Sequence, residues 1–126
     1  MCTICRSCAS DFGLDEVTST GPTYCAQLKN GKIDQFEIRP EVINIPNSTL
    51  QNLTGGSPEN NAREIIELLN GKNGYFRDIV ILNASSTLVA TGNAINFEDA
   101  KQKVENSLNE GKALKKMSHL IEVSNK

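Results

Sequence analysis

Residues 24–38 read YCAQLKNGKIDQFEI, two stretches of partly alternating apolar and polar residues that meet at Asn30 and Gly31. An Asn-Gly pair readily adopts the positive φ angles of the two-residue turn that joins antiparallel strands. The alternation itself is typical of strands that bury one face. The sequence therefore predicts a β-hairpin with strands over residues 24–28 and 32–38.

Downstream of the hairpin, the spacing of apolar residues predicts helices. Ser57 can cap the first helix, Pro58 suits its first position, and Gly71 supplies a left-handed end. Residues 77–90 are ambiguous, because their apolar first half is typical of a buried strand and their small later residues suit a close-packed helix. Their length favours a deeply buried helix that ends at Gly92.

Two further helices are predicted, one that begins after Asn96, a natural cap, and one that begins after Gly111. Their apolar stripes are Phe97, Ala100, Val104 and Leu108 in one, and Ala113, Leu114, Met117, Leu120 and Ile121 in the other. The pattern thus predicts a β-hairpin followed by about four helices in one domain. Two strands offer little apolar surface to four helices, so we expect that part of the sheet is missing.

The overall charge and hydropathy exclude several classes of partner. Thirteen basic and fifteen acidic residues give a net charge of -2, which predicts neither a nucleic-acid surface nor an anionic membrane surface. The longest apolar run, residues 79–82, is far shorter than a membrane span. The beginning of the chain has no apolar core of a secretory signal, so we expect a cytoplasmic protein with reduced cysteines.

Residues 1–12 differ in composition from everything after them, because Cys2, Cys5 and Cys8 fall within eight positions. We expect this segment to be disordered, as terminal segments are unless they are tied down. The spacing of its cysteines also resembles the opening of a bacterial iron–sulfur motif, with Cys25 as the one possible fourth ligand. The usual completion of that motif is absent, and a cysteine-ligated metal module remains an alternative.

Asp15 and Glu16 are adjacent carboxylates in a loop that precedes the turn at Gly21 and Pro22. Mg²⁺ is typically held by one or two protein carboxylates, and substrate phosphates and water complete its shell. Most exposed acidic pairs are simply solvated, however. The pair alone leaves both interpretations open.

Four short segments in the same order connect this sequence to a known family. They are GLDEVTSTGPT at residues 13–23, GGSPENNA at 55–62, RDIVILNA at 77–84 and GKAL at 111–114. Together they closely resemble anthranilate phosphoribosyltransferase of tryptophan biosynthesis. The resemblance extends over residues 13–124.

The resemblance implies an α/β fold of the nucleoside phosphorylase and anthranilate phosphoribosyltransferase type. It implies an enzyme that transfers phosphoribosyl from phosphoribosyl pyrophosphate to the amine of anthranilate, with Mg²⁺ as cofactor. In the matching motif the adjacent acidic residues ligate Mg²⁺ at the pyrophosphate, a role that passes to Asp15 and Glu16. No residue of the chain is implied as a catalytic nucleophile. The family forms homodimers, mainly through a helical domain without a counterpart here.

Other features of the family have no counterpart in the sequence. These are its Gly-Thr-Gly-Gly-Asp phosphate loop, its Lys-His-Gly-Asn-Arg segment and its N-terminal helical domain, and Phe12 replaces a usual Asp. We therefore expect residues 13–126 to be a partial α/β glycosyltransferase domain that is inactive alone, with residues 1–12 as a substitute start such as a shifted reading frame. The alternative is a non-catalytic remnant, or half of a split enzyme that needs an N-terminal partner.

Overall fold

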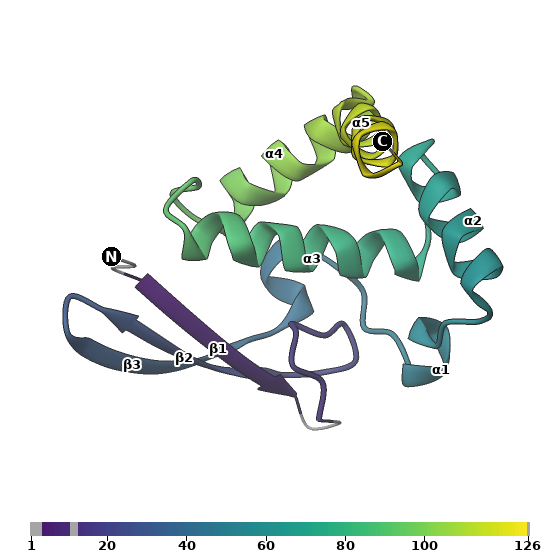
Figure 1. Ribbon diagram of the computed structural model, residues 1–126. Helices are drawn as coiled ribbons and strands as arrows, with labels where there is room; N and C mark the ends of the chain where they lie inside the picture. Colours follow the sequence, from purple (N-terminus) through teal and green to yellow (C-terminus); the bar gives the residue numbers. More distant parts are fainter. Residues whose placement is uncertain (1–3, 11–12, 126) are drawn as a thin grey trace.

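The computed structural model describes residues 4–10 and 13–125. The described residues form a three-stranded sheet followed by one 3-10 helix and five α-helices (Figure 1). The bounds are β1 (Ile4–Ser10), β2 (Thr23–Lys29), β3 (Lys32–Ile38), η1 (Pro40–Ile43), α1 (Leu50–Leu53), α2 (Pro58–Leu69), α3 (Tyr75–Ala90), α4 (Phe97–Asn109) and α5 (Lys112–Ser124). None of the described helices is long and apolar enough to span a membrane.

Strands β2 and β3 form the predicted hairpin. They pair antiparallel, and Lys29 opposite Lys32 is the last pair before the turn. Asn30 and Gly31 have φ angles of 52° and 76°, which are the positive values that this tight turn requires. The prediction from the Asn-Gly pair is confirmed.

Strand β1 corrects the expectation of disorder for residues 4–10. The backbone of Ile4–Ser10 pairs antiparallel with β2, from Ile4 opposite Lys29 to Ser10 opposite Thr23, and the strand order is β1-β2-β3. A strand at the edge of a sheet is stabilised by its backbone hydrogen bonds even where its sequence is polar. The apolar pattern of residues 4–10 therefore did not predict β1. Residues 1–3 and 11–12 lie outside the described residues.

Helix α3 lies between the sheet and α4, as Figure 1 shows, and α2 and α5 lie together near one end of it. Residues 77–90 are thus helical, as their length predicts. The hydrophobic core draws on every layer around this helix. Its buried members are Val17, Cys25, Ile38, Ile43, Ile45, Leu68, Ile81, Leu82, Val104 and Leu108.

Arg77 fixes the beginning of α3 against two other helices. Its side chain is 7% exposed, and it donates one hydrogen bond to the carbonyl of Leu68 in α2 and one to Oδ1 of Asn109 in α4 (2.8 Å). A buried charged group needs such partners, because desolvation is otherwise costly. The hydrogen bonds of Arg77 therefore set how α2, α3 and α4 meet.

Replacing Leu82 with alanine tests the central place of α3. Leu82 is completely buried, so Leu82→Ala should lower the free energy of unfolding by about 3 kcal/mol through lost contacts and a cavity. The matched control is Leu120→Ala in α5, where the side chain is 63% exposed and the loss should be below about 0.5 kcal/mol. Urea denaturation measures both, and equal losses would contradict this packing.

Candidate functional site

The acidic pair lies in the connection between β1 and β2, close to the last pair of that ladder. Both Asp15 and Glu16 are exposed. Just before them, Leu14 and Ser10 are joined by two hydrogen bonds: the Ser10 N–H donates to Leu14 O (3.1 Å) and the Leu14 N–H donates to Ser10 Oγ (3.2 Å). Glycine suits position 13, because its φ of 74° is unfavourable for residues with a side chain.

Three polar residues that follow the acidic pair are almost completely buried. Thr18, Ser19 and Thr23 are at most 1% exposed, and each has a hydrogen-bond partner. The Thr18 N–H donates to Thr23 Oγ1 (3.1 Å), and Ser19 binds Ser48 both through the two hydroxyls (2.7 Å) and through backbone atoms (2.8 Å). Satisfied polar networks of this kind stabilise one conformation of a loop.

Asn83 of α3 binds the same loop directly after Glu16. Its Oδ1 accepts a hydrogen bond from the Val17 N–H (3.0 Å), and its Nδ2 donates one to the Val17 carbonyl (2.7 Å). Nδ2 also donates to the carbonyl of Ile79, one turn earlier in α3 (3.1 Å). The loop is thereby held to the central helix by a side chain that is 66 residues away in the sequence.

A cavity of about 480 Å³ adjoins the acidic pair. Its lining is Leu14, Glu16, Leu50, Leu53, Thr54, Phe76, Ile79, Val80 and Asn83. Among the described residues that line it, Glu16 alone is charged, and the other residues are apolar or neutral. The site thus combines one carboxylate with a mostly apolar wall contributed by α1 and α3.

Asp15 and Glu16 are a suitable pair of ligands for Mg²⁺, but only part of a coordination shell. No group of three or more His, Cys, Asp and Glu side chains that could hold a metal occurs among the described residues. A site with two carboxylates fits Mg²⁺, which commonly takes its remaining oxygens from phosphates and water. The donor set therefore suits a cation that arrives with a phosphate-bearing substrate.

The cysteine-ligated metal module stays a hypothesis. Cys2 lies outside the described residues, and Cys5 and Cys8 are described only through the backbone of β1. Cys25, its proposed fourth ligand, is 4% exposed and belongs to the core. Its backbone lies opposite that of Cys8.

The glycine pair before α2 forms an internally bonded turn. The Gly56 N–H donates to Oδ1 of Asn61 (2.7 Å), and Ser57 Oγ accepts from the Asn60 N–H as the predicted helix cap. Because these side chains already occupy the beginning of the helix, the local geometry agrees with a structural role for this motif.

Comparison with known proteins shows which family the chain belongs to. The family described as "Glycosyl transferase family, a/b domain" matches residues 8–114. The chain belongs to this family. Its relatives include the anthranilate phosphoribosyltransferases of Rhodopseudomonas palustris, 41% identical over 113 residues, and Parvibaculum lavamentivorans, 37% identical over 113 residues. Each alignment covers 90% of this chain and 33% of the relative.

Solved structures give the same result for the fold of this glycosyltransferase domain. Anthranilate phosphoribosyltransferase from Saccharomyces cerevisiae in complex with PRPP and Mg superimposes with a TM-score of 0.85 at 25% identity. The match covers 94% of this chain and 35% of the yeast chain. The fold class expected from the resemblance is therefore confirmed, and the chain spans about a third of the length of the relatives it matches.

The contacts of Asn83 and Ser48 with the loop were not foreseen from the sequence. The one available indication was Asn83, a polar residue directly after the apolar run of residues 79–82. Nothing in the sequence pattern identifies its partner, which lies on a loop far away along the chain.

The titration of Asp78, in the first turn of α3, offers a test of the packing beside the site. Burial raises the pKa of this carboxyl, although the positive charges of Lys101 and Arg77 oppose the shift. Below the pKa of Asp78 in the unfolded chain, the neutral carboxyl carries no desolvation cost in the fold. As the pH rises through the raised pKa of the folded protein, the carboxyl ionises and the fold loses that stability. Asp78→Asn should raise Tm at pH 7 by about 1 to 3 °C.

The gain from Asp78→Asn should shrink towards pH 4, because protonation of the native carboxyl removes the cost of burying its charge. Asp34→Asn is the matched control, because Asp34 is exposed on β3 and no burial opposes its charge. Thermal melts at both pH values test the account. A lower Tm for Asp78→Asn at pH 7 would contradict it.

Proposed function

We propose that Asp15 and Glu16 bind Mg²⁺ at the pyrophosphate group of phosphoribosyl pyrophosphate. The reaction we propose is the transfer of phosphoribosyl to anthranilate, a step of tryptophan biosynthesis in the cytoplasm. The observation that supports it best is an exposed carboxylate pair on a loop whose following residues are buried and hydrogen-bonded to Asn83, Thr23 and Ser48. The relatives' names and the yeast complex with PRPP and Mg support the choice of substrate and cation.

The chemistry explains why a cation site is useful in this reaction. The bond between the ribose carbon and pyrophosphate breaks, and the amine nitrogen of anthranilate bonds to that carbon, so no protein nucleophile is required. Mg²⁺ supplies stabilisation of the negative charge that develops on the departing pyrophosphate. The contribution of this chain is to hold two carboxylates in place, so that little reorganisation is needed when the cation and substrate bind.

We further propose that the chain alone does not catalyse the transfer. It spans about a third of the relatives, and the phosphate loop and Lys-His-Gly-Asn-Arg segment of the family have no counterpart in its sequence. Positioning of the two reactants contributes many orders of magnitude to such reactions. A cation site without the groups that orient the ribose and the amine would not supply that contribution.

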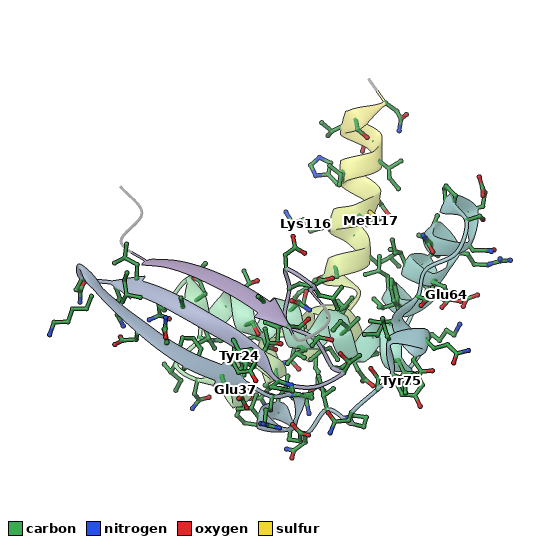
Figure 2. All side chains as sticks on the ribbon, turned by 90° about the horizontal axis from the view of Figure 1, so that it is seen from below. Tyr24, Glu37, Glu64, Tyr75, Lys116 and Met117 are labelled. Carbon is green, nitrogen blue, oxygen red and sulfur yellow. The ribbon has the colours of Figure 1, made fainter. Side chains whose placement is uncertain are left out.

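The second candidate function is that of a binding partner for a separate polypeptide, as half of a split enzyme. The observation that favours it is an apolar surface on the sheet. Tyr24, Leu28 and Ile33 are 53%, 43% and 70% exposed. By the alternation of β2 and β3 they lie on the face opposite the buried Thr23, Cys25 and Ile38, and Figure 2 labels Tyr24 and its cross-strand neighbour Glu37.

Substitution of both carboxylates tests the cation site. Binding of Mn²⁺ in the presence of inorganic pyrophosphate, measured by electron paramagnetic resonance, should be at least about tenfold weaker in Asp15→Asn/Glu16→Gln, because the ligands lose their charge. Asp34→Asn, with its carboxylate exposed on β3, should bind as the unchanged chain does. Equal affinity in the double variant and the unchanged chain would refute the site.

An activity assay separates the two candidate functions. We expect no product from the purified chain with phosphoribosyl pyrophosphate, anthranilate and Mg²⁺. Addition of the N-terminal two thirds of the Rhodopseudomonas palustris relative should produce Mg²⁺-dependent transfer if the chain is half of a split enzyme. Absence of rescue would favour a non-catalytic chain, and turnover by the chain alone would disprove our proposal that it is inactive.

A further inference from the structure

We propose that Asn83 is the positioning residue that holds the loop of Asp15 and Glu16 in its cation-binding conformation. This inference rests on the proposed function, because it concerns the same carboxylates. Asn83 has no proposed contact with the substrate or the cation, and it acts through the backbone of Val17.

The carboxamide of Asn83 matches the backbone of Val17 in both directions. An amide side chain offers an acceptor and a donor in one plane, so Oδ1 can accept from the Val17 N–H while Nδ2 donates to the Val17 carbonyl. The side chain of Val17 is 3% exposed and belongs to the core. Loss of either bond would leave a backbone group poorly satisfied beside the core, which is unfavourable.

Asn83 is itself rigidly placed. Its Nδ2 also donates to the Ile79 carbonyl, and its own carbonyl accepts a hydrogen bond from Thr87 Oγ1 (2.9 Å). The preceding residues Ile81 and Leu82 are 4% and 0% exposed, so this part of α3 is fixed by core packing. The hydrogen bonds of Asn83 therefore fix the loop relative to α3, whose own position is set by the core.

The carboxylates lie between two fixed points of the loop. On one side are the two hydrogen bonds between Ser10 and Leu14, and on the other is Val17, directly after Glu16. Glu16 and Asn83 also line the same cavity. Without the bonds to Asn83, the acidic pair would gain conformational freedom, and binding of the cation would have to reverse that gain in entropy.

Asn83→Ala is the first test, with Mn²⁺ and inorganic pyrophosphate as the probe. The affinity of the purified chain for Mn²⁺ should fall about fivefold, because the ligands are no longer pre-organised. Hydrogen exchange of the Val17 amide should become at least about tenfold faster, while amides in the middle of α3 keep their protection. A role confined to stability would leave the Mn²⁺ affinity of the folded variant unchanged.

Asn109→Ala is the matched control. It removes the same type of side chain and also a hydrogen bond that stabilises α3, but this 2.8 Å bond comes from Arg77 and not from the loop. Its Mn²⁺ affinity should equal that of the unchanged chain. If Asn83→Ala does not fold, Asn83→Leu replaces it, since an apolar side chain of similar size forms neither hydrogen bond and adds no charge to the cavity that Glu16 lines.

The outcomes distinguish this inference from the proposed function. If Asp15→Asn/Glu16→Gln loses Mn²⁺ binding but both Asn83 variants that fold bind normally, the positioning role is overturned and the cation site stands. If the double variant binds as tightly as the unchanged chain, both proposals are overturned. A reduced affinity in the Asn83 variants, with normal affinity in Asn109→Ala, supports the role.

Discussion

Helix α3 is buried between the sheet and α4, and the other parts of the described structure are arranged around it. Arg77 bonds to α2 and α4 near its beginning, Ile81 and Leu82 are buried in the core, and Asn83 bonds to the loop of the acidic pair. A helix with apolar residues on nearly all sides must be covered on nearly all sides. This requirement brings together segments that are far apart in the sequence.

The same burial explains how an exposed carboxylate pair can have a defined position. Asp15 and Glu16 lie in solvent, but the residues immediately after them are buried, and their polar groups bind Asn83, Thr23 and Ser48. Buried polar groups stabilise a unique conformation when each has a partner. An accessible pair of carboxylates is thus joined to a rigid base, which suits the cation site that we propose for a phosphate-bearing substrate.

Much of this architecture can be predicted from local patterns. Asn30 and Gly31 identify the hairpin, Ser57 and Asn96 cap the helices as expected, and the matching motif identifies the acidic pair. Strand β1 was missed because an edge strand can form through backbone hydrogen bonds without an apolar pattern. The partner of Asn83 was missed because a contact across 66 positions depends on tertiary packing, which local periodicity does not encode.

The central claim is that a cation binds at the loop of Asp15 and Glu16 and that α3 positions this loop. The most direct test is paramagnetic broadening in the NMR spectrum of the ¹⁵N-labelled chain, with Mn²⁺ and inorganic pyrophosphate. The account predicts that the amides of residues 13–17 and the side-chain amide of Asn83 broaden first, while those of α5 remain sharp. Broadening centred elsewhere, or uniform broadening along the chain, would contradict it.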